Sequence, residues 1–161
     1  MALGSGCVSI GLATKLNRPI HNLRHMMEPD KKLLLGRDLV VGLLPDAIPR
    51  SLDSTYNCMG LVFGSRRTAI DIDELVPILE DDGYREIGDL RSLEFGDVVA
   101  YGDDGSLSHV GLIWKPISRE PIADYWVISQ LGYFGEYFHH IRNVPVEYGR
   151  PLKYFTDRRV V

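Results

Sequence analysis

The sequence predicts an α+β domain in which helices come first and an antiparallel sheet follows. Two observations carry this prediction. An apolar stretch, residues 58–63, directly follows the turn-like segment 53–57, which is rich in capping residues and typical of a helix start. After Tyr84, β-branched and aromatic residues gather in short runs separated by turn residues, which is typical of strands joined by hairpins. Helices before a series of strands indicate the α+β class.

The length and charge of the chain bound its organisation. With 161 residues and a net charge of -4, the chain is long enough for one domain with its own hydrophobic core. We therefore expect a single domain over 1–161, with 1–20 as a loose arm. The basic residues are scattered, and the adjacent ones form only pairs, at 66–67 and 158–159. This distribution argues against a nucleic-acid partner.

Cysteine usage and hydropathy indicate where the protein works. Cys7 and Cys58 are the two cysteines, too few for a disulfide framework, so a reducing compartment is expected. The first residues lack the basic region and apolar core of a signal peptide. The most apolar stretch, 33–44, is interrupted by Arg37 and Asp38 and is shorter than the roughly 20 residues that span a bilayer. We expect a soluble, cytoplasmic protein without a membrane partner, and export by a route other than a cleaved signal stays open.

Helix and loop signals order the first half of the chain. Residues 21–27 are predicted to form a helical turn, and Pro45 and Pro49 mark a loop that leads to Cys58. Gly64 is expected to end the helix that Cys58 begins. A second helix is predicted over 71–82, closed by a glycine at position 83.

The second half of the chain reads as a meander of strands. Residues 98–101 and 110–114 flank a turn at 102–106, whose Asp-Gly pair favours a hairpin. Residues 125–130 form a third β-rich run. A tight turn with packed aromatic rings is expected around Gly132 and Gly135, followed by a final strand or arm.

Cys58 and His109 are the residues that point to chemistry. Backbone N–H groups at a helix start carry partial positive charge, so this position is expected to lower the cysteine pKa. His109 opens the second strand of the predicted hairpin. A thiolate at a helix start and an imidazole on a strand supply a nucleophile and its base.

Three ordered motifs carry a resemblance to a known group of enzymes. Asn57-Cys58-x-Gly60, then Phe95-Gly96-Asp97-Val98-Val99, then His109-Val110-Gly111-Leu112-Ile113 resemble the papain-like hydrolases of the NlpC and CHAP type over residues 53–130. The resemblance implies a papain-like fold, with N-terminal helices packed on an antiparallel sheet or half-barrel. It also implies a cysteine peptidase or amidase without a cofactor, in which Cys58 attacks a peptide or amide carbonyl, His109 acts as base and the Cys58 N–H stabilises the oxyanion.

The remaining site residues are assigned by the same resemblance. Similar enzymes carry a third polar residue on the strand after the histidine strand, which selects Gln130, with Ser129, Glu136 and His139 as alternatives that reach the imidazole. Tyr56 and Asn57 are candidates for binding substrate beside the nucleophile, and His139 for a place at the border of the cleft. Asn57 also suits a purely structural role as the cap of the helix.

Two other functions stay open at this point. The same fold without catalysis would use an aromatic-rich cleft to bind a protein or peptide. His21 and His25 are four residues apart, a spacing that suits metal ligands on a helix, and with His139 they would make a zinc site. Asn22 stands where a metalloprotease helix carries its glutamate, and no third ligand follows nearby, so we expect no metal.

Overall fold

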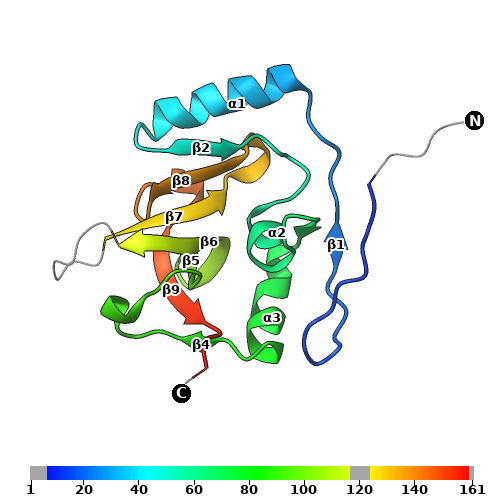
Figure 1. Ribbon diagram of the computed structural model, residues 1–161, viewed down its shortest axis with the longest axis vertical. Helices are drawn as coiled ribbons and strands as arrows, with labels where there is room; N and C mark the ends of the chain where they lie inside the picture. The colour runs from blue at the N-terminus through cyan, green and yellow to red at the C-terminus, as the bar shows by residue number, and fades with distance from the viewer. Residues whose placement is uncertain (1–6, 117–123, 160–161) are drawn as a thin grey trace, which may run out of the picture.

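The computed structural model describes residues 7–116 and 124–159 of the chain (Figure 1). The elements, in chain order, are β1 (Asn22–Leu23), α1 (Asp30–Leu43), β2 (Ile48–Ser51), α2 (Cys58–Phe63), β3 (Ala69–Ile70), η1 (Ile72–Glu74), α3 (Leu75–Asp81), β4 (Arg85–Glu86), η2 (Leu90–Ser92), β5 (Val98–Asp103), β6 (Ser106–Pro116), β7 (Tyr125–Gln130), η3 (Gly132–Phe134), β8 (Glu136–His140), η4 (Val146–Tyr148) and β9 (Arg150–Thr156). The α+β class predicted from the sequence is confirmed.

The large sheet is antiparallel and has the strand order β2-β8-β7-β6-β5-β9-β4. Strands β5 to β8 are sequential neighbours, so the predicted meander is confirmed. The last strand, β9, returns to pair with β5 on the other side of the meander. Register within the β5–β6 hairpin places Tyr101 opposite His109. Asp104 and Gly105 both have positive φ, 49° and 83°, which is the backbone that an Asp-Gly hairpin turn favours.

The helix that starts at Cys58 is confirmed, and the next one is shorter than predicted. The Asn57 side chain caps α2, and Gly64 is its C-cap residue. The segment 71–82 divides into η1 and then α3, which begins at Leu75. This division leaves Pro77 in the first turn of α3, where its missing N–H costs no helical hydrogen bond.

Two local predictions were wrong or incomplete. Residues 21–27 are not a helical turn, because Asn22 and Leu23 form β1 and pair with β3. The apolar stretch after Pro29 forms α1, a helix that the sequence pattern did not reveal because apolar residues occur all around it. Its buried positions include Gly36, where a Cβ atom would lie 2.3 Å from the Phe134 ring, so the absence of a side chain lets α1 approach η3.

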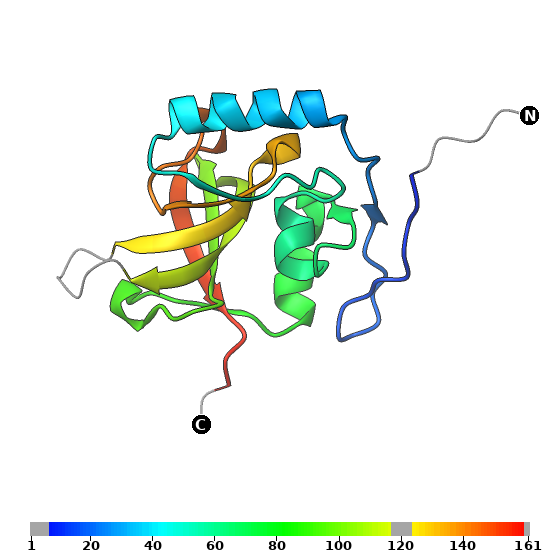
Figure 2. The same cartoon turned by 45° about the horizontal axis from the view of Figure 1, so that its top comes forward.

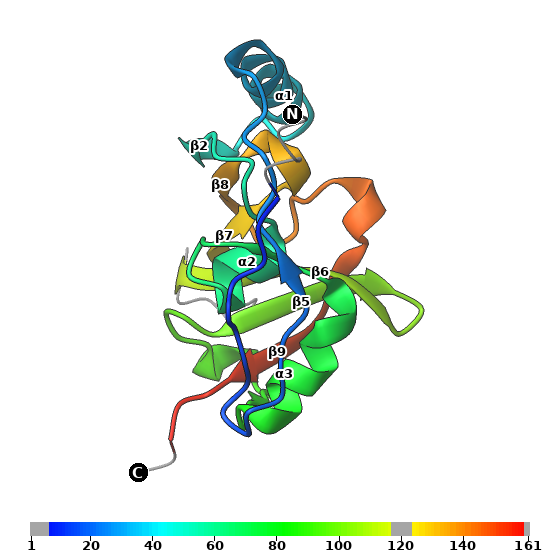
Figure 3. The same cartoon turned by 90° about the vertical axis from the view of Figure 1, so that its right-hand side faces the viewer.

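Apolar side chains cover both faces of the large sheet. On one face the helices α2 and α3 and the N-terminal arm form successive layers, as Figures 2 and 3 show. The cluster between the sheet and these helices contains Met59, Ile70, Leu75, Ile78, Val98, Ala100 and Val110. The cluster on the opposite face contains Leu93, Val99, Tyr101, Ile113, Tyr125, Val127 and Ile141. Because side chains alternate along a strand, Val110 belongs to the helix face and its neighbour His109 to the other.

The described part of the predicted arm, residues 7–20, is held by polar contacts to the end of α3. The Thr14 hydroxyl donates to Asp81 at 2.7 Å, the Lys15 N–H donates to Asp82 at 2.7 Å, and Arg18 pairs with Asp81 at 2.8 Å. Within the described residues, no helix is long and apolar enough to cross a membrane.

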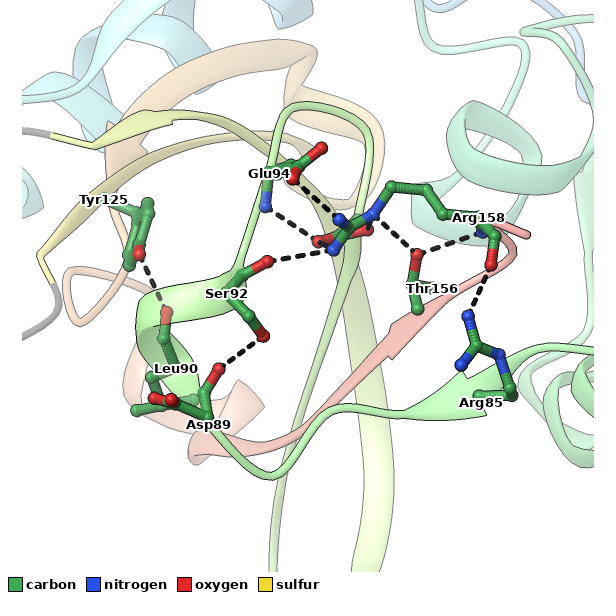
Figure 4. Close-up of polar contacts among 9 residues, drawn as sticks. Arg85, Asp89, Leu90, Ser92, Glu94, Tyr125, Thr156 and Arg158 are labelled. Carbon is green, nitrogen blue, oxygen red and sulfur yellow. Dashed lines mark hydrogen bonds and ion pairs between the residues drawn. The ribbon is translucent and has the colours of Figure 1, made fainter. Parts of the chain in front are cut away.

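The chain beyond β9 is fastened to the segment before β5 through Arg158 (Figure 4). Its guanidinium donates to the buried Asp97 at 2.7 and 3.1 Å and to the Ser92 carbonyl at 2.9 Å, and it pairs with Glu94 at 2.9 Å. Asp97 also accepts the Glu94 N–H at 2.8 Å, which closes the turn that precedes β5. The aspartate of the Gly-Asp motif therefore has a structural role.

Candidate functional site

A cleft of about 410 Å³ opens at the start of α2, between that helix and the β1–β3 ribbon. Cys58 and its neighbours Asn57 and Met59 form one wall, and residues from β1, β3 and the start of β6 complete it. Five of the side chains that line this cleft can react with a ligand or form hydrogen bonds to it: Cys58, His21, His25, Asp71 and Ser108. Cys58 thus lies where a ligand can reach it.

The Cys58 thiol is half-buried and packs against the apolar cluster of the helix face. Burial raises the pKa of the thiol above its usual value, and the backbone N–H groups of Val110, Met59 and Cys58 lower it by less. The expected effect of the helix start is therefore present but is outweighed. The expectation that the cysteine pKa is lowered overall was wrong. Burial destabilises the thiolate by more than the backbone N–H groups stabilise it.

Both the oxygen and the nitrogen of the Asn57 side-chain amide form hydrogen bonds. Its Oδ1 accepts the N–H of Gly60 at 2.9 Å and that of Ile70 at 3.0 Å, and its Nδ2 donates to the Ile70 carbonyl at 2.7 Å. These bonds fasten the start of α2 to β3. Asn57 lines the cleft, but its polar atoms are committed to the backbone, which matches the structural alternative considered from the sequence.

His109 is almost completely buried, and its ring lies among tyrosines on the sheet face opposite α2. It stacks on Tyr148 with 4.1 Å between ring centroids and lies 5.5 Å from the Tyr101 ring. Its Nε2 atom is buried with no hydrogen-bond partner among the described residues. Burial, assisted by the charge of His139, lowers the pKa of His109 to about 3, so the ring is neutral near pH 7.

Cys58, on α2, packs against the face of β6 that carries Val110, whereas the His109 side chain lies on the other face of that strand. The Val110 N–H, one residue from His109, acts on the thiol. The charge of Cys58, after burial, also contributes to raising the pKa of Tyr148, the phenol that stacks on His109. Within 7–116 and 124–159, no hydrogen bond joins the thiol to the imidazole.

The other predicted site residues belong to structural networks. Gln130 is buried, and its amide donates to the carbonyls of Asp53 at 2.7 Å and Gly132 at 3.2 Å. Its side chain thus holds the loop before α2, and it makes no hydrogen bond to His109 in the described contacts. The hydroxyl of Tyr56 donates to Glu136 at 2.9 Å and lies inside the protein, away from the cleft.

The Glu136 carboxylate forms ion pairs as well as hydrogen bonds. Besides Tyr56 it accepts Arg66 at 2.8 Å and Arg50 at 2.9 Å, both half-exposed arginines. Burial opposes its ionisation, but the hydrogen bonds from Arg66 and Tyr56 outweigh it and lower the pKa of the carboxyl group. Glu136 is therefore an ionised anchor between β8, β2 and the segment after α2.

His139 and Ser129 form a second buried pair. Nδ1 of His139 lies 2.8 Å from the His140 carbonyl, which can only accept, so Nδ1 carries the proton and Nε2 accepts the Ser129 hydroxyl at 2.6 Å. Burial lowers the pKa of His139 to about 4. Both side chains are inaccessible, so His139 does not border the cleft as predicted, and this pair has no route to a substrate.

Sequence reasoning missed His21, His25 and Ser108 as residues that share a cleft with Cys58. Because β1 pairs with β3, the two histidines lie near the start of α2. No local sequence pattern predicts that pairing. The three-histidine zinc site is not formed, since the described residues contain no group of three or more His, Cys, Asp or Glu side chains placed to hold a metal.

Comparison of the chain with protein-family models, with curated proteins and with solved structures found no match.

Proposed function

We propose that this domain is a papain-like cysteine hydrolase, a peptidase or amidase, with Cys58 as nucleophile and His109 as base. The observation that carries the proposal is the position of the thiol. Cys58 is the first residue of α2, lies in the wall of a cleft, and has the strand that bears His109 directly beside it. The ordered motifs shared with the NlpC and CHAP type agree with this arrangement.

The chemistry assigns each group a step. His109 takes the thiol proton, and the sulfur attacks the carbonyl carbon of a peptide or amide. The C–N bond breaks, and the amine leaves with the proton from His109. Water then hydrolyses the thioester and restores the thiol. The Cys58 N–H at the helix start stabilises the oxyanion. Because the His109 ring lies on the face of β6 opposite α2, the reaction requires the start of β6 to shift and present His109 to the thiol, which a rotation of the ring alone cannot do.

A second candidate, a non-catalytic module that binds a protein or peptide in the same cleft, is favoured by the directions of the two pKa shifts. A raised thiol pKa and a lowered imidazole pKa both work against a thiolate–imidazolium pair. In such a module Cys58 is a small, half-buried apolar side chain in the wall of the binding site.

An ester probe separates the two candidates. The assay uses p-nitrophenyl acetate with a Cys7→Ser variant, which removes the exposed second thiol. The hydrolase predicts a burst of one nitrophenolate per chain followed by turnover, lost in Cys58→Ser. His109→Gln should slow the burst about 100-fold or more, whereas the matched histidine variant His140→Gln should leave it unchanged.

Labelling of Cys58 by iodoacetamide against pH gives an independent readout. In the hydrolase the labelling rate depends on His109, so the pH profile changes in His109→Gln. In the binding module the labelling rate keeps increasing with pH past about 8.5, the ordinary thiol pKa, with the same profile in both proteins. Absence of a burst together with identical labelling profiles would reject the enzymatic proposal and retain the module.

A further inference from the structure

A β-bulge precedes His109 in strand β6. The β5–β6 pairing is regular up to His109, which lies opposite Tyr101, but the next pair joins Leu107 to Gly102, so Ser108 is an extra residue without a partner on β5. Leu107 packs against the cluster beneath α2 and α3, and Ser108 lines the cleft at the start of α2. These two successive side chains therefore lie on the same side of the strand, an interruption of the alternation that is typical of a bulge.

The place of this bulge decides which face of the sheet His109 occupies. Because opposite residues of an antiparallel pair share a face, His109 lies with Tyr101 on the face away from α2. In a shifted register, with the bulge at Ala100, Ser108 pairs with Tyr101 and His109 lies beside Val110 on the α2 face. Only Ser108 and His109 exchange faces in this shift, and the pairing beyond Val110 is unchanged.

The segment that contains the bulge is held weakly enough for such a shift. Among the described residues, β6 pairs with β7 only from Leu112 onward, so β5 is the one strand that pairs with residues 106–111. In the observed register the buried Nε2 atom of His109 has no hydrogen-bond partner among the described residues, which destabilises this arrangement. In the shifted register the same ring reaches the cleft that Cys58 lines, where it can form hydrogen bonds.

Tyr148, the last residue of η4, holds the bulge in the observed register. Its ring stacks on His109, with 4.1 Å between the ring centroids and 6° between the ring planes. Its carbonyl oxygen accepts the Ser108 hydroxyl at 3.1 Å. Gly149 follows with a φ of 75°, and a Cβ atom there would lie 2.4 Å from the Gly102 carbonyl oxygen, so this turn packs closely on β5 beside the bulge. Both residues that would exchange faces thus contact Tyr148.

We propose that the bulge in β6 is a conformational switch for the Cys58 site, and that Tyr148 holds the switch in its inactive register. The inference rests on the proposed function for its consequence, because His109 serves as base only when the shifted register places it on the face that Cys58 contacts. A ligand that binds in the cleft and contacts His109 favours the shifted register, since binding moves an equilibrium through a difference in affinity for the two states.

Nuclear Overhauser contacts of the His109 ring protons identify the register directly. In the wild-type protein the ring should contact Tyr148. Tyr148→Ala removes the stacked ring and should increase the population of the shifted register about tenfold, which gives contacts from the His109 ring to Met59 on the α2 face. Tyr148→Phe keeps the ring and should behave like the wild-type protein.

Ser108→Lys tests whether Ser108 and His109 exchange faces. Ser108 is exposed in the observed register, so lysine fits there, but the shifted register would bury its charge beside Tyr101. Exchange between the registers should appear as relaxation dispersion of the amides of residues 107–110 in Tyr148→Ala, and it should disappear when Ser108→Lys is added. Ser106→Lys, at the exposed tip of the hairpin, is the matched control and should leave the exchange unchanged.

The nitrophenyl acetate assay in the Cys7→Ser background separates the switch from the hydrolase. If both proposals hold, Tyr148→Ala makes the burst about tenfold faster and Ser108→Lys abolishes it. Exchange with contacts to Met59 but without a burst keeps the switch and rejects the hydrolase. A folded Tyr148→Ala protein whose His109 ring stays on the face away from α2, or exchange that persists with Ser108→Lys, overturns the switch.

Discussion

Two buried histidines make the stability of this protein sensitive to mild acid. His109 and His139 are 1% and 0% exposed, and burial lowers the pKa of each from 6.5, to about 3 and about 4 respectively. In the unfolded chain both rings return to the ordinary value. Between about pH 6.5 and pH 4 the unfolded state therefore binds more protons than the folded state, so the free energy of unfolding falls as the pH falls.

The magnitude follows from the shifts. One pKa unit corresponds to about 1.36 kcal/mol, and pH 5 lies 1.5 units below the unfolded value. Each histidine then costs about 2 kcal/mol at pH 5 relative to pH 7, and both together about 4 kcal/mol. In a domain of this size 1 kcal/mol changes the melting temperature by about 2–4 °C, which predicts a decrease of about 8–16 °C. Glu136, whose pKa is lowered from 4.5, keeps its contribution at pH 5 and begins to lose it only as the pH falls below about 4.5.

Thermal unfolding followed by circular dichroism at pH 7 and pH 5 measures this effect. The difference between the two temperatures should fall by about half in His109→Gln and in His139→Gln, and nearly vanish in the double variant. His21→Gln, on the surface, is the control and should keep the wild-type difference. A wild-type decrease below about 3 °C, or an equal decrease in the double variant, would refute the assignment of these rings as buried and neutral.

Three further predictions concern stability, each read from urea unfolding. Arg158→Ala leaves the buried Asp97 without its cation and should cost about 3 kcal/mol; a loss below about 1 kcal/mol would contradict this structural role. Glu136→Gln removes the anchor of two arginines and a tyrosine and should cost about 2–4 kcal/mol, and the loss should shrink as the pH falls through the lowered pKa of the wild-type carboxyl group. Gly60→Ala places a Cβ 1.8 Å from a backbone carbonyl and should cost at least about 3 kcal/mol, whereas Gly88→Ala, with open space, should change stability by less than about 0.5 kcal/mol.

Local patterns predicted the elements that depend on residues close in the chain. The Asp104-Gly105 turn, the strand over Tyr125–Gln130 and the cap of α2 at Asn57 are examples. In each, a turn residue with positive φ, a run of β-branched and aromatic residues or a capping side chain acts within a few positions. Helix α1 was not predicted, because its apolar residues do not lie on a single face. The close approach of α1 to η3 at Gly36 depends on Phe134, which is distant in the sequence.

Some features of the candidate site were likewise predictable from the sequence, and others were not. That Cys58 begins a helix was predictable, since the cap and the apolar run are adjacent to it. The direction of its pKa was not, because burial under distant segments outweighs the local amide groups. Likewise the strand that begins at His109 was predicted from the sequence, but whether His109 or Val110 meets α2 depends on which face of the sheet the helix covers.

The sequence by itself determined the α+β order, the turns, the start of α2 and the placement of a cysteine there, because these depend on backbone preferences and side chains within a few residues of each other. Tertiary structure alone decided that His21 and His25 share the cleft with Cys58, that Gln130, Glu136 and His139 serve structural networks, and that α1 keeps an apolar side uncovered. Burial and the pairing of strands depend on contacts between segments that are distant in the chain, and the free energy of those contacts leaves no local sequence pattern.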